Sequence, residues 1–132
     1  MSMQSQVKSN VIGWALDPAQ RERLLRAFSP VYPDVIADHV TLAVGVGDEA
    51  ALPHEVCGEI VGRVDDRAGL EVMVVSIGGT TQRPGGGIYH ITWSLDRARE
   101  RTAVQSNHVL AGWSWAALPW PIPIKLAPTR WP

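Results

Sequence analysis

The sequence contains a single cysteine, Cys57, among its 132 residues. One thiol cannot form an internal disulfide, and it cannot build a zinc site of the Cys-rich type. A chain without disulfides fits a reducing compartment. Cys57 itself lies in an apolar strand pattern, which predicts an unreactive thiol within the core.

Excess charge of one sign and long apolar runs are also missing. The formal net charge is −1, which argues against a protein that coats nucleic acid through a strongly basic surface. No apolar run approaches the length needed to span a membrane, and residues 1–6 lack the apolar segment of a signal peptide. We therefore expect no membrane partner and a cytoplasmic location.

The chain does contain enough apolar sequence for one folded domain. Apolar residues make up 45% and charged residues 19%, which is ordinary for a globular protein. A chain of this length buries roughly two-thirds of its unfolded surface. We predict a single domain over 1–132, with a flexible segment at 1–10 and a Trp- and Pro-rich tail at 111–132 that packs on the domain.

Apolar and β-branched runs alternate with turn residues, and this pattern predicts more strands than helices. An amphipathic helix is predicted over 18–28, with Asp17 as its N-cap and Pro18 in its first turn. A second, short helix is predicted to start at Ser106, with that side chain as its cap. The predicted strands cover 11–16, 39–46, 56–64, 70–77, 88–95 and 121–126, the last an edge strand because prolines interrupt it. The fold class is therefore α+β with few helices.

One four-residue pattern occurs twice, each time within a predicted strand. The chain reads His-Val-Thr-Leu from His39 and His-Ile-Thr-Trp from His90. Because side chains alternate along a strand, Thr41 shares a face with His39, and Thr92 shares one with His90. The apolar residues of the two strands are predicted to face the other way: Val40, Leu42, Val44, Ile91, Trp93 and Leu95. If the two polar faces meet, they form a cleft with two histidines and two threonines.

This doubled motif resembles the 2H phosphoesterase superfamily, which includes the 2′–5′ RNA ligase-like proteins and the cyclic phosphodiesterase domains of tRNA ligases. The order of elements over 11–96 is also similar: a strand, a helix, the first motif, a hairpin and the second motif. The second motif, within 89–95, is most similar to the tRNA-ligase-type branch. The resemblance implies a two-lobed α+β fold in which antiparallel sheets flank a central cleft that holds both motifs.

The residue types of the motif suit hydrolysis of a phosphodiester. A neutral histidine can activate water, and a protonated one can protonate the leaving alkoxide, although the sequence does not assign these roles. Two threonine hydroxyls can donate hydrogen bonds to the phosphate oxygens, so neither a metal nor another cofactor is expected. Four further residues are candidates for substrate contacts: Tyr32, Arg83, Lys125 and Arg130.

The resemblance implies a metal-independent phosphodiesterase that acts on 2′,3′-cyclic phosphate ends of RNA or nucleotides, or on 2′–5′ linkages. Two other functions stay open: a non-catalytic nucleotide- or RNA-binding module on the same fold, and an enzyme that degrades cyclic oligonucleotides. A purely structural interpretation is open too, with partly buried histidines and ordinary strand-forming threonines. The tail tryptophans are predicted mainly to complete the core, with base stacking as the alternative.

Overall fold

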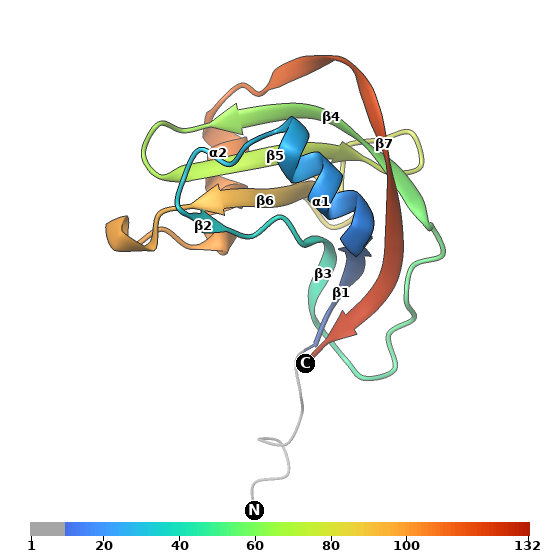
Figure 1. The fold of residues 1–132 in the computed structure, drawn as a ribbon. Coiled ribbons are helices and arrows are strands. Elements are labelled where there is room, and N and C mark those ends of the chain that lie inside the picture. Colours follow the sequence, from blue (N-terminus) through green and yellow to red (C-terminus); the bar gives the residue numbers. More distant parts are fainter. Residues whose placement is uncertain (1–9) are drawn as a thin grey trace, which may run out of the picture.

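The computed structural model describes residues 10–132 and shows a curled antiparallel sheet, shaped like half of a barrel, with two α-helices (Figure 1). The strands are β1 (Asn10–Leu16), β2 (Asp34–Val35), β3 (His39–Val46), β4 (Cys57–Asp65), β5 (Leu70–Ser76), β6 (His90–Leu95) and β7 (Ala116–Trp131). The helices are α1 (Pro18–Ala27) and α2 (Ser106–Gly112), and short 3₁₀ helices occupy Arg97–Arg99 and Ala103–Gln105. The predicted α+β class with few helices is confirmed.

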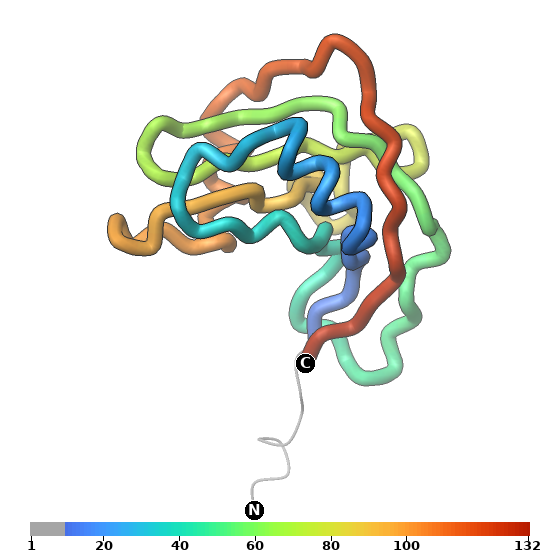
Figure 2. Tube along the Cα trace, viewed as in Figure 1, coloured from blue at the N-terminus to red at the C-terminus, as the bar shows by residue number. Residues whose placement is uncertain are grey.

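The strands hydrogen-bond in the order β2-β6-β5-β4-β7-β1-β3, and every pair is antiparallel. The long strand β7 joins two parts of the sheet, because its first half pairs with β4 and residues 126–131 pair with β1. Figure 2 shows this second half running beside the N-terminal strand. The strand predicted over 121–126 is thus part of a longer strand that lies inside the sheet order and not at its edge, although residues 122–125 pair on one side only, with β4. Its prolines are tolerated because each half of β7 pairs with a neighbour on one side only.

The two helices cover opposite faces of the sheet (Figure 1). Leu24 of α1 packs in a core cluster with Trp93, and Leu110 of α2 packs in a second cluster with Val72. Strands β5 and β6 are consequently buried on both faces, which holds the second motif in a rigid setting. Within residues 10–132, no helix is both long and apolar enough to cross a membrane.

Helix α1 begins as its sequence predicts. The Asp17 carboxylate accepts a hydrogen bond from the backbone N–H of Gln20 at 2.9 Å, and Pro18 occupies the first turn. The prediction of a core thiol fails at the start of β4. Cys57 is exposed where β4 begins, so it is not a core thiol. The predicted flexible segment 1–10 lies outside the described residues except for Asn10, which is buried and donates to Asp48 at 2.6 Å.

Strand β3 contains a bulge that the sequence does not reveal. Ile12 pairs with Ala43 and Gly13 pairs with Thr41, so one extra residue of β3 lies between the two pairs. The extra residue disturbs the alternation of side chains beyond Thr41. Val44, predicted to face the core, is instead 70% exposed. In β6 the alternation predicted for Ile91 and Trp93 holds, while Leu95 packs beneath α2.

Strands β1 and β3 approach each other too closely at Gly13 for any other residue. A Cβ atom at this position would lie 2.1 Å from the carbonyl oxygen of Val40. The obstacle is backbone, so a rotamer change in a neighbouring side chain cannot relieve it. Gly13 therefore fixes the distance between β1 and the strand that carries the first motif.

We expect Gly13→Ala to lower the free energy of unfolding by about 1–3 kcal/mol, because the added methyl group must push β3 away from β1. The measurement is denaturant unfolding followed by circular dichroism. Gly47→Ala is the matched control, because a Cβ there meets nothing within 4 Å. Equal unfolding midpoints for the two variants would show that the β1–β3 contact is not as tight as described.

Candidate active site

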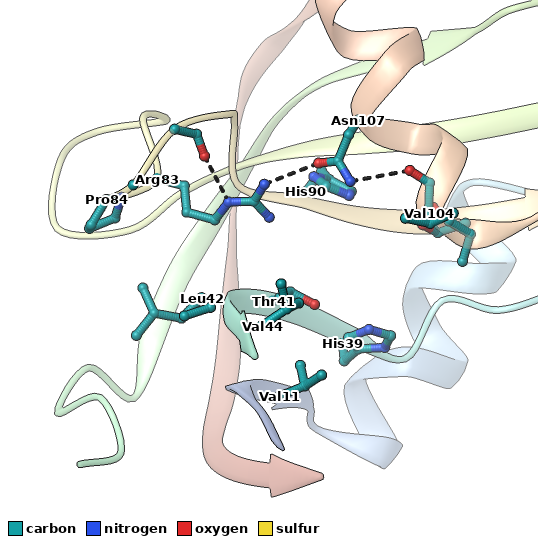
Figure 3. Close-up of a pocket in the computed structure, with 15 residues that line it drawn as sticks. Val11, His39, Thr41, Leu42, Val44, Arg83, Pro84, His90, Val104 and Asn107 are labelled. Atoms are coloured by element: carbon teal, nitrogen blue, oxygen red, sulfur yellow. Dashed lines mark hydrogen bonds between the residues drawn. The ribbon is translucent and has the colours of Figure 1, made fainter. Parts of the chain in front are cut away.

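Strands β3 and β6 lie opposite each other across a cleft of about 510 Å³. Figure 3 shows His39 and Thr41 on one wall and His90 on the opposite wall. Thr92 lines the same cleft. The structure therefore brings the two copies of the motif together, although they are far apart in the sequence.

The cleft opens where the segment that follows β2 separates from β6 and begins β3. The backbone N–H groups of Ile36 and Ala37 still donate to carbonyls of β6, at 3.0 and 2.9 Å. Arg21 of α1 holds the same two residues, because its Nη2 donates to the Ile36 carbonyl at 3.0 Å and its Nε to the Ala37 carbonyl at 2.8 Å. Ala37 has φ of 47°, a left-handed conformation that is uncommon for alanine. The chain then diverges from β6, and His39 begins β3 on the other wall.

His90 is buried and held in one tautomer. Its Nδ1 lies 2.7 Å from the Ile88 carbonyl oxygen, which can only accept, so Nδ1 carries the hydrogen. In the neutral ring, Nε2 is then the proton acceptor that remains for a ligand. Burial lowers the pKa of His90 below 6.5, and the charges of Arg83 and His39 lower it further against the opposing effect of the Ile88 carbonyl. His90 is therefore neutral at pH 7, as a general base must be.

The lowered pKa of His90 predicts that the folded protein protonates this ring at a lower pH than the unfolded chain does. We expect a midpoint below 6.5 when the ring signals are followed by NMR against pH. Between that midpoint and pH 6.5 the unfolded chain binds more protons than the folded one. The contribution of His90 to stability is thus fully present above pH 6.5 and is lost as pH falls through the folded pKa. A midpoint at or above 6.5 would contradict the burial of the neutral ring.

His39 is more exposed and has an acidic partner. Its Nδ1 contacts the carboxylate of Asp38, which accepts the hydrogen bond and leaves Nε2 for the cleft. When the ring is protonated, Nε2 can donate a proton to a bound ligand, and the carboxylate balances the charge. The ring also packs against Trp131 of β7, with centroids 5.2 Å apart. For most of the tail tryptophans the sequence predicts a place in the core or over a sheet edge, whereas Trp131 packs on His39, where the pairing of β7 with β1 places it.

The Thr92 hydroxyl is positioned by Ser106, for which the sequence predicts a different role as the cap of α2. Its Oγ1 lies 2.9 Å from the Oγ of Ser106 and 3.4 Å from the carbonyl of Ala103. Ser106 was predicted to cap α2, but Gln105 holds the N-cap position and Ser106 is fully buried against Thr92. If Ser106 donates to Thr92, the threonine hydrogen is donated to the Ala103 carbonyl over a long 3.4 Å, and it can turn from that weak acceptor to a ligand oxygen. Nothing local in the sequence distinguishes this role from a cap.

Arg83 is the one predicted substrate contact that lines the cleft. Its Nε donates to the Gly86 carbonyl at 3.0 Å, and its Nη2 donates to Oδ1 of Asn107 at 3.1 Å, as Figure 3 shows. The charged or titratable groups lining the cleft are Arg83 and the two histidines, and no aspartate or glutamate is among the described residues there. The cleft is therefore suited to an anion.

The other three predicted contacts have structural partners away from the cleft. The Tyr32 hydroxyl donates to Asp65 at the β4–β5 turn, at 2.6 Å. The side chain of Lys125 is exposed, and its backbone N–H donates to Gln20 of α1 at 2.6 Å. Arg130 donates to backbone carbonyls of the β3–β4 loop. None of the three lines the cleft, so the structure does not support them as contacts to a phosphate held between the histidines.

Within residues 10–132, no group of three or more histidine, cysteine, aspartate or glutamate side chains is arranged to bind a metal ion. No protein-family model, curated protein or solved structure matches this chain. The arrangement and chemistry of the cleft alone therefore bear on its function.

Proposed function

We propose that this protein is a phosphodiesterase of the 2H type, which hydrolyses 2′,3′-cyclic phosphates at RNA or nucleotide ends by general acid/base catalysis without a metal. The observation that carries the proposal is the placement of two His-x-Thr motifs on opposite walls of one cationic cleft. A structural role for the histidines gives no reason for both motifs to line one cleft. In this interpretation the two parts of the sheet that β7 joins correspond to the two lobes of the family fold.

The different surroundings of the histidines assign their roles. The neutral Nε2 of His90 takes a proton from a water molecule as its oxygen attacks phosphorus. The bond from phosphorus to one ribose oxygen breaks, and the protonated Nε2 of His39 donates a proton to that oxygen. His90 ends protonated and His39 ends neutral, and exchange with solvent restores both. The product is a phosphomonoester.

Charge on the phosphate is balanced by donors on both walls of the cleft. Thr41 and Thr92 supply hydroxyl groups, and Ser106 orients the second of them. The Arg83 guanidinium supplies a fixed positive charge beside His90. Donors held in place in this way stabilise the charge that develops in the transition state. The proposed reaction then has no step that needs a metal. The cytoplasmic location of the protein stays a prediction.

The experiment is a turnover assay of the full chain in EDTA, read by ³¹P NMR. The substrates are 2′,3′-cyclic mononucleotides, short RNAs ending in a cyclic phosphate, 2′–5′-linked oligonucleotides and cyclic oligonucleotides. We expect the 2′,3′-cyclic phosphates to give a phosphomonoester product at the same rate with EDTA as without it. Binding without turnover of any substrate would establish the binding-module alternative. Turnover that disappears in EDTA would disprove the metal-independent mechanism. Turnover of the cyclic oligonucleotides alone would favour the alternative in which the protein is an enzyme that degrades cyclic oligonucleotides.

A further inference from the structure

A second cavity, of about 730 Å³, adjoins the cleft. It lies between the loop that precedes β6 and helix α2. Arg83, Gly86 and Asn107 line both the cleft and this cavity. The two spaces are thus neighbours that share a wall. Both volumes fall in the range of about 300–1,000 Å³ that is usual for ligand sites.

The shared wall is built from hydrogen bonds that a ligand can replace. Arg83 donates to Asn107, and the Asn107 amide donates in turn to the Val104 carbonyl at 3.1 Å. Both bonds are exposed, so water competes for their donors and acceptors and each stabilises the wall only weakly. The loop that carries Arg83 also contains Gly85, Gly86 and Gly87, and glycine permits more backbone conformations than any other residue. Exchange of the Arg83–Asn107 bond for a contact to a ligand phosphate therefore has a small cost.

The lining of the second cavity matches the chemistry of a nucleobase. Ile88, Leu110 and Ala111 provide apolar surface, and the side-chain amides of Gln82 and Asn107 provide hydrogen-bond donors and acceptors. A base offers apolar faces and polar edges in the same way. No aspartate or glutamate is among the described residues that line either space, so a polyanionic chain meets no like charge there.

Building on the proposed function, we infer that this cavity binds the nucleotide on the 5′ side of the one that carries the cyclic phosphate. The direction follows from the chemistry of the substrate. A nucleotide whose 2′ and 3′ oxygens are joined to one phosphate can be linked to a neighbour only through its 5′ oxygen. The linking phosphate then passes Arg83, which is the cationic residue common to both spaces. The substrate class is thus an oligonucleotide end, which is preferred over a cyclic mononucleotide.

The test compares kcat/KM for a 2′,3′-cyclic mononucleotide with that for a dinucleotide ending in the same cyclic nucleotide. The variant is Ala111→Trp, since Ala111 is exposed on α2 and a large side chain there fills the second cavity. Ala19→Trp, on the exposed side of α1, is the matched control. We expect the wild-type and control proteins to prefer the dinucleotide by about 10–100-fold, as burial of one base against apolar side chains permits. In Ala111→Trp this ratio should fall to near one.

Equal kcat/KM values for the two substrates in the wild-type protein would overturn the inference and leave the proposed function intact. A ratio that Ala111→Trp does not change would overturn it as well. If neither substrate is turned over, the proposed function fails. The dissociation constants of the same two compounds then test whether the second cavity is a nucleotide subsite. Tighter binding of the dinucleotide that is lost in Ala111→Trp would support the subsite, and equal binding would refute it.

Discussion

Replacing His90 with alanine should reduce turnover of a 2′,3′-cyclic phosphate by about 10²–10⁴-fold, the usual contribution of a positioned general base. His90 is neutral because it is buried, and the Ile88 carbonyl fixes its tautomer with Nε2 as the proton acceptor. No described residue that lines the cleft can replace this base, since the other titratable groups there are His39 and Arg83. The measurement is kcat/KM for the wild-type protein and the variant at pH 7.

His54→Ala serves as the control for His90→Ala. His54 is exposed in the loop between β3 and β4, outside the cleft, so its removal should leave turnover unchanged. Circular dichroism of both variants checks that the sheet remains folded. A folded His90→Ala protein that keeps wild-type turnover would show that the base lies elsewhere.

Replacing His39 with alanine should cause a loss of similar size for the cyclic phosphate, about 10²–10⁴-fold, because the ribose oxygen is a poor leaving group without a proton. The loss should depend on the leaving group, which a structural role for His39 would not produce. With a nucleoside 3′-(4-nitrophenyl) phosphate, whose nitrophenolate leaves unprotonated, we expect His39→Ala to lose little activity. His90→Ala should keep its full deficit on the same substrate.

This pair of substrates separates the two roles. If His39→Ala is as defective on the nitrophenyl ester as on the cyclic phosphate, His39 does not act as the acid. If His90→Ala, and not His39→Ala, recovers on the nitrophenyl ester, the two assignments must be exchanged. Asp38 supports the assignment of His39 as the acid, because its carboxylate accepts the hydrogen bond from Nδ1 and leaves Nε2 to face the cleft.

Local sequence patterns were sufficient for most of the secondary structure. The apolar, β-branched run after His39 defined β3 at His39–Val46, and the Asp17-Pro18 pair defined the start of α1. The doubled His-x-Thr motif was equally local, and it identified four residues that share one cleft. These features depend on neighbours within a few residues, and such information is carried by the sequence of each segment.

Features that depend on pairing between distant segments could not be predicted. The prolines of 121–126 indicated an edge strand, because a sequence cannot show that β7 changes partner from β4 to β1 along its length. The same change of partner brings Trp131 against His39. The bulge opposite Gly13, which exposes Val44, likewise depends on the register of two strands.

The choice of partner for a polar side chain was also beyond local patterns. Ser106 has the residue type of a helix cap and lies at the start of a helix, but its hydroxyl reaches Thr92 of β6. Tyr32 and Arg130 have the chemistry of phosphate contacts, but they serve turns of the sheet. Arg83 differs from them because the loop that carries it forms a wall of the cleft.

The central claim is that His39 and His90 act on one phosphate in one step. The most direct test is a double-mutant cycle of kcat/KM in EDTA with wild type, His39→Ala, His90→Ala and the double variant. Residues that act as a unit are strongly non-additive, so the double variant should be little worse than the more severe single variant. Losses that multiply independently, or a single variant that retains wild-type turnover, would contradict a shared site.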